Sequence, residues 1–420
     1  KRSARVLPVA FAVWGHPELA SVIINDHASI AGGELEKHMM ETVYLDNAAT
    51  SHPKPEAVYR AHDQFLRSGG SPGRGAHQLS VAASQVVFET RLQIAKLIDV
   101  ADPERVIFTP GCTHSINMVL KGWHWQAGDV VVVSALEHNA VSRPLNQLSA
   151  SLGVKIVSAP YSAGQIVDPS QLASLLREVK PAMCIMQEAS NVTGEMLNLP
   201  DIDEVCRRQN VPLLVDAAQS AGLFHASLSG LAVSFWCASG HKGLLGAPGV
   251  GVLYVRPDLD LEPLIAGGTG SHSETVQMPS AYPDRLESGT VAGPAIAALG
   301  AGAAWLTASN RQELRQHELA LAAEFRHRVC KNKAIQLYGV ETNLRVPVVS
   351  FSVADMAAGT VAELLDRNFN ICVRSGLHCA AWAHRTLGTS LQGLVRVSFG
   401  CCNSQADIDA LCSALETILN

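Results

Sequence analysis

The sequence lacks the features that mark several large classes of protein. No apolar run approaches the roughly 20 residues that a membrane-spanning helix needs. The 10 cysteines are too dilute for a disulfide scaffold and form no Cys-x-x-Cys pair, so we expect neither a disulfide framework nor a metal site. Positive charge is not in excess, because 32 Lys and Arg stand against 38 Asp and Glu, a net charge of −6. We therefore expect a cytoplasmic protein that binds neither nucleic acid nor membrane.

Apolar residues, by contrast, are plentiful. They make up 47% of the 420 positions, which is enough for a large core and two domains. Near the start, Lys1, Arg2 and Arg5 precede an apolar run over 6–14, but the small-residue cleavage site of a signal peptide does not follow. We expect a poorly ordered or non-native leader over 1–40, an N-terminal arm over 41–60 that begins with a strand over 42–45, a large domain over 61–300 and a small domain over 301–420.

From about residue 100, short apolar runs alternate with helical patterns, which predicts an α/β fold around a large, mostly parallel sheet. The run over 130–134 is continuously apolar, as is typical of a strand buried on both faces. Seven strands are expected, over residues 106–109, 130–134, 154–158, 182–187, 213–216, 235–238 and 250–255. Later in the chain, helices over 295–306, 312–329 and 407–419 and strands over 347–353, 371–374 and 394–399 predict a second, smaller α/β unit.

Polar residues that are suited to binding or catalysis lie at or just after the carboxyl ends of these strands. Open α/β sheets bind ligands at that edge, so we expect a site there. The residues are Thr113, His138, Asn191, Asp216 and the run Ser239-Gly240-His241-Lys242.

Lys242 and Asp216 together indicate which ligand this site takes. A lysine amine that forms a Schiff base and a carboxylate that keeps a pyridine nitrogen protonated are the requirements of a pyridoxal phosphate (PLP) site. Taken singly, Lys242 reads as a surface charge and Asp216 as a helix N-cap. Their combination at strand ends favours the cofactor.

Further motifs occur in the order that is found in one enzyme family. They are Tyr44-Leu45-Asp46-Asn47-Ala48-Ala49-Thr50, Glu137-His138-Asn139, Ser190-Asn191-Val192-Thr193-Gly194, Asp216-Ala217-Ala218-Gln219, Arg374-Ser375-Gly376-Leu377-His378-Cys379-Ala380 and Val395-Arg396-Val397-Ser398. Over residues 41–420 the chain resembles the class V aminotransferases, and among them the group II, selenocysteine-lyase-like cysteine desulfurases. The resemblance implies PLP-dependent transferase fold type I, with a large seven-stranded sheet domain and a smaller C-terminal α/β domain.

The resemblance also implies a role for each residue around the cofactor. Lys242 carries PLP and moves protons, Asp216 binds the pyridinium, and His138 stacks on the ring and acts as a second catalytic group. Gln219 donates a hydrogen bond to the phenolic oxygen of the cofactor, and Asn191 lies nearby, close to the carboxylate of the substrate, which it helps to bind. The phosphate is held by Cys112, Thr113, Ser239, His241 and, from the second subunit of a homodimer, Thr290. From the residues alone, His138 as a structural histidine and Thr113 as a simple N-cap stay open.

Substrate residues are implied in the second unit. Arg396 lies in an apolar strand, where its planar fork suits either a substrate carboxylate or an internal Asp or Glu. Arg374 is the second implied carboxylate contact. Cys379 follows a Gly-x-His loop and matches the family's persulfide-forming cysteine, whereas Cys184, Cys237 and Cys330 read as small buried residues and Cys401-Cys402 as a packed thiol pair.

The activity implied is conversion of L-cysteine to L-alanine, with the sulfur left on Cys379 for a protein acceptor such as those of iron–sulfur cluster assembly. Three rivals stay open. The first is a selenocysteine or cystine lyase that does not need Cys379. The second is another class V enzyme, such as an epimerase or hydrolase. The third is a regulatory protein that only binds PLP.

Overall fold

The computed structural model describes residues 42–73, 75–224, 227–271 and 273–419, so the leader expected over 1–40 lies outside the described residues. Residues 1–43 and 44–420 separate as two units, and the second carries the predicted fold. Within the described ranges, none of the helices is long and apolar enough to cross a membrane.

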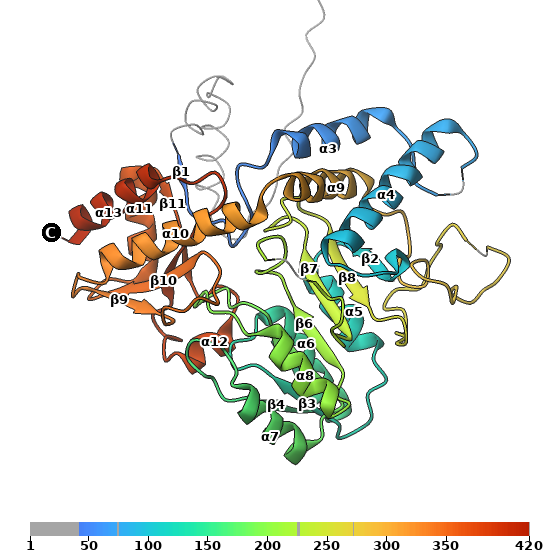
Figure 1. Cartoon of the computed structure of the whole chain (residues 1–420), viewed down its shortest axis with the longest axis horizontal. Helices are drawn as coiled ribbons and strands as arrows, with labels where there is room; N and C mark the ends of the chain where they lie inside the picture. The colour runs from blue at the N-terminus through green and yellow to red at the C-terminus, as the bar shows by residue number, and fades with distance from the viewer. Residues whose placement is uncertain (1–41, 74, 225–226, 272, 420) are drawn as a thin grey trace, which may run out of the picture. The chain divides into compact units, whose positions relative to one another are not determined.

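A seven-stranded sheet forms the centre of the large domain (Figure 1). Its order is β2-β8-β7-β6-β5-β3-β4, and only β8 runs antiparallel to its neighbours. The bounds are β2 (Val106–Thr109), β3 (Val130–Val133), β4 (Lys155–Ser158), β5 (Met183–Gln187), β6 (Leu213–Asp216), β7 (Phe235–Ser239) and β8 (Gly251–Val255). The prediction of seven strands in a mostly parallel sheet is confirmed.

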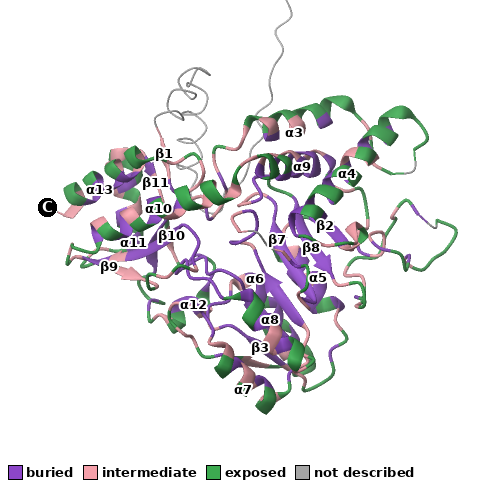
Figure 2. Ribbon diagram, viewed as in Figure 1, coloured by how far each residue is buried: buried purple, intermediate pink, exposed green. Residues whose placement is uncertain are grey.

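Alternate residues of each strand enter two separate cores, one on each face of the sheet. Val131 and Val133 of β3 pack with α5 and α6, whereas Val132 packs in the cluster that holds residues of α4, α7, α8 and α9. Figure 2 shows the strands buried between helices that expose their outer sides. This explains the apolar runs, because both side-chain directions of a strand are buried. The helices are α4 (Gln78–Leu97), α5 (Cys112–Gly122), α6 (Asn139–Leu152), α7 (Pro169–Val179), α8 (Leu199–Arg208) and α9 (Gly293–Ala308), and α3 (Glu56–Ser68) packs on α9.

The C-terminal part contains a four-stranded antiparallel sheet of order β12-β13-β10-β9. Its register places Arg374 of β12 directly opposite Arg396 of β13. The expected strand over 371–374 divides into β11 (Ile371–Cys372) and β12 (Arg374–Gly376), and β9 (Ile335–Tyr338) was not expected. The remaining elements are β10 (Val348–Val353), β13 (Leu394–Ser398), α10 (Arg311–Val329), α11 (Ala358–Phe369), α12 (Ala381–Thr386) and α13 (Gln405–Leu419), while β1 (Val43–Tyr44) begins the arm.

Candidate active site

A cavity of about 590 Å³ lies at the carboxyl edge of the large sheet, where the sequence predicted a site. Its polar lining comes from the loops that follow β2, β3, β5, β6 and β7. It contains Cys112, Thr113, His138, Asn191, Asp216, Gln219, Ser239, His241 and Lys242. These predicted residues are therefore brought together, although Cys112 and Lys242 are 130 positions apart in the sequence.

Lys242 follows β7 and enters this cavity from the loop after Ser239. Burial lowers the pKa of the Lys242 ammonium, and the negative charge of Asp216 opposes that shift. No described residue accepts a hydrogen bond from the Lys242 amine. Since the free amine is the nucleophile that attacks an aldehyde, both features suit Schiff-base chemistry.

The N-terminal arm fixes the residue that precedes Lys242. The carbonyl oxygen of His241 accepts hydrogen bonds from the Ser51 N–H (3.1 Å), the Thr50 hydroxyl (3.1 Å) and the Lys54 ammonium (3.1 Å). On its other side, the Lys242 loop packs tightly against the backbone at Gly222. A Cβ at Gly222 would lie only 2.1 Å from the Gly243 oxygen. No local pattern assigned these arm residues a role.

Asp216 ends β6 and is the single carboxylate among the described residues that line the cavity. Its Oδ1 accepts hydrogen bonds from the Ala218 N–H (2.9 Å) and the Cys112 thiol (3.5 Å). None of the described residues donates to Oδ2. Cys112 therefore contacts Asp216 and also lines the cavity itself.

Glu137 is a buried acid behind the cavity to which the sequence assigned no role. Its Oε1 accepts from the Ser134 hydroxyl (2.6 Å) and the Gln187 N–H (2.8 Å), whereas the buried Oε2 has no hydrogen-bond partner in the described chain. Burial raises the pKa of Glu137 to about 8, so it is neutral at pH 7. The negative charge at the cavity is left to Asp216.

His138 caps helix α6, since its Nδ1 accepts the Ala140 N–H at 3.0 Å. Burial lowers the pKa of His138, which keeps the ring neutral. A neutral ring whose Nδ1 accepts carries its proton on Nε2. The capping role that the residues left open is present, and the ring still lines the cavity as a neutral face with one donor.

One end of the cavity is built for an anion. Thr113 lies in the first turn of α5, where backbone N–H groups and the helix dipole favour negative charge. A Cβ on Gly251 would lie 2.5 Å from the Gly111 carbon, so glycine allows β8 to support this turn closely. Ser239 and His241 line the same cavity, and burial lowers the pKa of His241 to about 4.

Arg396 is buried beside the cavity and its fork is already engaged. Its Nη2 donates to Asp46 Oδ1 at 2.7 Å and its Nη1 donates to the Asn191 carbonyl at 3.2 Å, while the buried Nε has no hydrogen-bond partner among the described residues. Arg374 lies 3.6 Å from the same Asp46. The internal acid that the sequence left open thus exists. Binding of a substrate carboxylate by Arg396 and Arg374 stays a prediction.

Cys379 lies on an exposed loop that two asparagines tie to the cavity. Asn191 Nδ2 donates to the His378 carbonyl at 2.8 Å, and the Asn139 N–H donates to the Cys379 carbonyl at 2.7 Å. His378 and Cys379 have φ angles of 49° and 53°, a left-handed conformation that costs roughly 1–2 kcal/mol for each non-glycine residue. The two hydrogen bonds hold this strained loop next to His138 and Asn191.

Thr290 is the one predicted cofactor residue that the chain keeps away from this cavity. It is exposed and lines a separate hollow with Phe108 and Val291. Its predicted contact was to the cofactor of a second subunit, so its position in one chain neither supplies nor removes that contact.

The cavity is suited to a ligand that carries an anion, a basic nitrogen and an aldehyde. These groups match the start of α5, Asp216 and the Lys242 amine in turn. Two buried polar atoms in the lining also lack partners in the described chain, Asn191 Oδ1 and His241 Nδ1. Buried polar groups are usually satisfied, so these atoms point to hydrogen bonds that a ligand completes.

Comparison with known proteins agrees with this geometry. The aminotransferase class-V family profile matches residues 43–411. A probable cysteine desulfurase of Methanothermobacter thermautotrophicus is 31% identical over 387 residues, which cover 90% of this chain and 95% of the relative. The cysteine desulfurase of Cronobacter sakazakii is 31% identical over 89% of this chain and 92% of its own.

Solved structures give the same result. The apo cysteine desulfurase of Thermococcus onnurineus NA1 superposes with a TM-score of 0.84 at 29% identity, over 90% of this chain and 94% of that one. The Escherichia coli cysteine desulfurase CsdA superposes with a TM-score of 0.82 at 28% identity, over 91% of this chain and 95% of that one. The chain belongs to the class V aminotransferase family. The family is PLP-dependent, and the architecture is the fold type I that the sequence predicted.

Proposed function

We propose that this protein is a PLP-dependent cysteine desulfurase that converts L-cysteine to L-alanine and transfers the sulfur to Cys379 as a persulfide. The observation that carries the proposal is that the predicted PLP-binding residues and the Cys379 loop lie next to each other. Lys242 and Asp216 share a cavity, and the Cys379 loop is hydrogen-bonded to Asn139 and Asn191 at its border. The relatives above, which match about nine-tenths of the chain, are named as cysteine desulfurases.

The cavity residues fit PLP at each of its polar groups. The first turn of α5, Thr113, Ser239 and His241 would hold the phosphate, and Asp216 Oδ2 would accept a hydrogen bond from the protonated ring nitrogen. Gln219 already donates one amide hydrogen to the Ala48 carbonyl at 3.0 Å, which leaves its second amide hydrogen for the ring oxygen. When bound, PLP supplies an electron sink that stabilises negative charge at the substrate Cα.

The chain's own groups move the proton and the sulfur. In its neutral form the Lys242 amine removes the proton from Cα, and burial favours that form because it lowers the pKa of the ammonium. The Cys379 thiolate forms a bond to the substrate sulfur as the bond from that sulfur to Cβ breaks. The electron pair stays on the carbon fragment, which takes up protons to give alanine. The persulfide then waits on the exposed loop for a protein acceptor.

The direct test incubates the purified, PLP-loaded protein with L-cysteine and measures alanine and persulfide together. Equal amounts of alanine and of Cys379 persulfide are expected in the first turnover. A reductant should then release sulfide and permit further turnovers. Racemised cysteine, or pyruvate in place of alanine, would assign the chain to another reaction of the family.

The Arg396 fork gives a second prediction. Arg396→Lys should raise KM for L-cysteine by about 10-fold or more with PLP content unchanged, because lysine keeps the charge but loses the bidentate geometry. The measurement is the cysteine concentration dependence of alanine formation.

Arg345→Lys is the matched control, because Arg345 is also buried and paired with an acid, Glu341 at 3.2 Å, but does not line the cavity. This variant should keep the wild-type KM. An unchanged KM in Arg396→Lys would show that Arg396 serves only the ion pair with Asp46.

We also propose that the enzyme is a homodimer. Large apolar side chains are exposed by 41–60% along α3 and α4, a surface that a second copy would cover. They are Tyr59, Leu66, Leu79, Val81, Phe88 and Leu92. The exposed Thr290 is free to reach a neighbouring subunit's phosphate, in keeping with its position outside the cavity of its own chain.

A further inference from the structure

Cys401 and Cys402 occupy the turn after β13, and the structure corrects the expectation that they form a packed pair. Cys402 is exposed and Cys401 is partly exposed, with their sulfur atoms 3.9 Å apart. Cys330, also expected to be buried, is exposed at the end of α10. The vicinal pair is therefore accessible to small molecules.

The turn holds both thiols in a fixed place. Asn403 Oδ1 accepts hydrogen bonds from the Gly400 N–H (2.8 Å) and from Asn47 Nδ2 (3.1 Å). Asn403 Nδ2 in turn donates to the Tyr44 carbonyl at 3.0 Å. A Cβ on Gly400 would lie 2.6 Å from the Asn47 side chain, so the turn is pressed against the arm.

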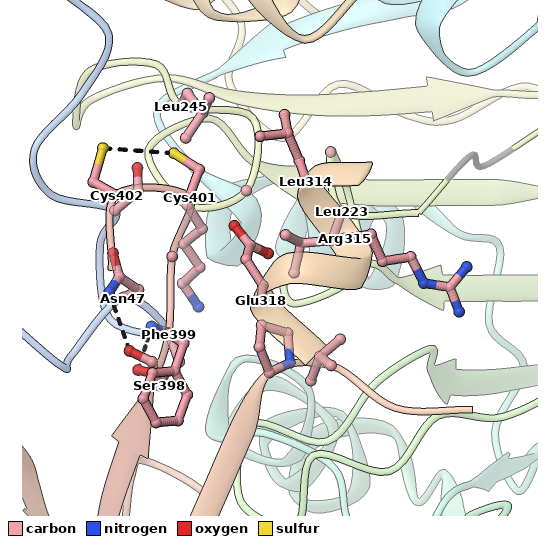
Figure 3. A pocket seen from close by; sticks show the side chains of 18 of the residues that line it. Asn47, Leu223, Leu245, Leu314, Arg315, Glu318, Ser398, Phe399, Cys401 and Cys402 are labelled. Carbon is pink, nitrogen blue, oxygen red and sulfur yellow. Dashed lines mark hydrogen bonds between the residues drawn. The ribbon is translucent and has the colours of Figure 1, made fainter. Parts of the chain in front are cut away.

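The thiols line a small, mostly apolar pocket (Figure 3), whose lining also includes Lys242 and Gln219 but not Cys379. Its volume of about 50 Å³ holds only a few water-sized groups. Glu318 of α10 points into the same pocket, is 5% exposed, and keeps a buried Oε2 without a hydrogen-bond partner in the described chain. An unsatisfied acid that faces two thiols is an unusual combination for a purely structural surface.

The charges of this group support a reactive thiol. A hydrogen bond from Cys401 lowers the pKa of Cys402 to about 6, and the pKa of Cys401 is raised by the same contact. Burial, and then the Cys402 charge, raise the pKa of Glu318 to about 8. These shifts favour the thiolate form of Cys402, the thiol form of Cys401 and the protonated form of Glu318.

We propose that Cys401 and Cys402 form a second sulfur-accepting site, separate from Cys379, which takes sulfane sulfur from small persulfides. The Cys402 thiolate is the nucleophile, Cys401 is the resolving thiol, and Glu318 supplies the proton to the departing thiolate. The source of persulfide rests on the proposed function, since a desulfurase generates sulfane sulfur at Cys379.

Both steps balance without an added oxidant. The Cys402 thiolate attacks the outer sulfur of a persulfide RS–SH, which gives Cys402–S–SH and RS⁻, and RS⁻ takes the Glu318 proton. The Cys401 thiol then attacks Cys402 Sγ, forms the disulfide with Cys402, and releases the outer sulfur with its protons as H₂S. The protein dithiol is oxidised and the sulfane sulfur is reduced to sulfide.

The test supplies glutathione persulfide to the reduced, full-length, PLP-loaded protein at pH 6 without L-cysteine. Labelling of each cysteine is followed by alkylation and peptide mass analysis, and Cys330 serves as the exposed control thiol. Cys402 should react about 10-fold faster than Cys330, because its larger thiolate fraction outweighs its lower intrinsic nucleophilicity.

Two variants separate the steps. Cys401→Ser should accumulate the Cys402 persulfide and release no H₂S, whereas Cys402→Ser should leave Cys401 unlabelled. Both should bind PLP to the wild-type level before treatment, which shows that they are folded. Equal rates at Cys402 and Cys330, or H₂S release that Cys401→Ser does not change, would overturn the proposal. Because the probe is added from outside, the result does not depend on whether the chain is a desulfurase.

Discussion

Lys242→Ala is expected to lower alanine formation by at least about 10³-fold, because it removes both the covalent anchor of the cofactor and the base that takes the Cα proton. The variant should still bind PLP at the phosphate end, where Thr113, Ser239 and the start of α5 are unchanged. The visible absorbance of the protein-bound cofactor should shift to that of the free aldehyde. Borohydride should no longer fix the cofactor to the chain.

Lys242→Arg sharpens this test because it keeps charge and bulk. A guanidinium stays protonated at all working pH values, so this variant should be as inactive as Lys242→Ala. Lys121→Ala removes an exposed lysine at the end of α5 and should keep full activity. Borohydride reduction that links PLP to another lysine in the wild-type protein would refute the role of Lys242.

The elements that the sequence predicted well are those with one dominant physical cause. Most strands of the large sheet are buried on both faces and appear as apolar runs, whereas the edge strand β4 is partly exposed. The observed ends of all seven differ from the predicted ones by no more than one residue. The cavity residues were found for a related reason. Parallel strands end at one edge, so polar residues that follow different strands meet there.

What the sequence could not give depends on contacts between distant segments. Asp46 pairs with Arg396 across 350 positions, and neither residue shows from its neighbours which acid meets which base. The same is true of Thr50 and Ser51, which hold the His241 carbonyl from a separate arm. Glu137 belongs to a motif of the sequence, but its burial and raised pKa follow only from the pairing of β3 with β5, whose Gln187 N–H donates to the Glu137 carboxyl group.

Thiol exposure was the least predictable property. Cysteine is small and apolar, so an accessible cysteine and a packed one look alike in sequence. Cys184 and Cys237 are buried in the sheet as expected, whereas Cys330 and Cys402 are exposed. In each case the decisive factor is whether a neighbouring element covers the position, and a local pattern does not contain that information.

The prediction that separates a desulfurase from a lyase concerns Cys379. Cys379→Ala should lower alanine formation from L-cysteine by at least about 100-fold, since the substrate sulfur loses the thiolate that accepts it. PLP content should not change, because Cys379 lies on a loop outside the cavity lining. Cys330→Ala removes another exposed thiol and should behave as the wild-type protein.

Selenocysteine supplies the discriminating arm of the experiment. The bond from carbon to selenium is weaker than that to sulfur, so its cleavage should persist in Cys379→Ala and give alanine. Loss with L-cysteine alone therefore supports the desulfurase, because only sulfur then needs the thiolate. Undiminished alanine from both substrates would make the protein a lyase in which Cys379 has no chemical part. Asn191 and Asn139 would then hold the strained loop for structural reasons alone. The conformational cost of approximately 1–2 kcal/mol for each left-handed residue would then serve no catalytic role.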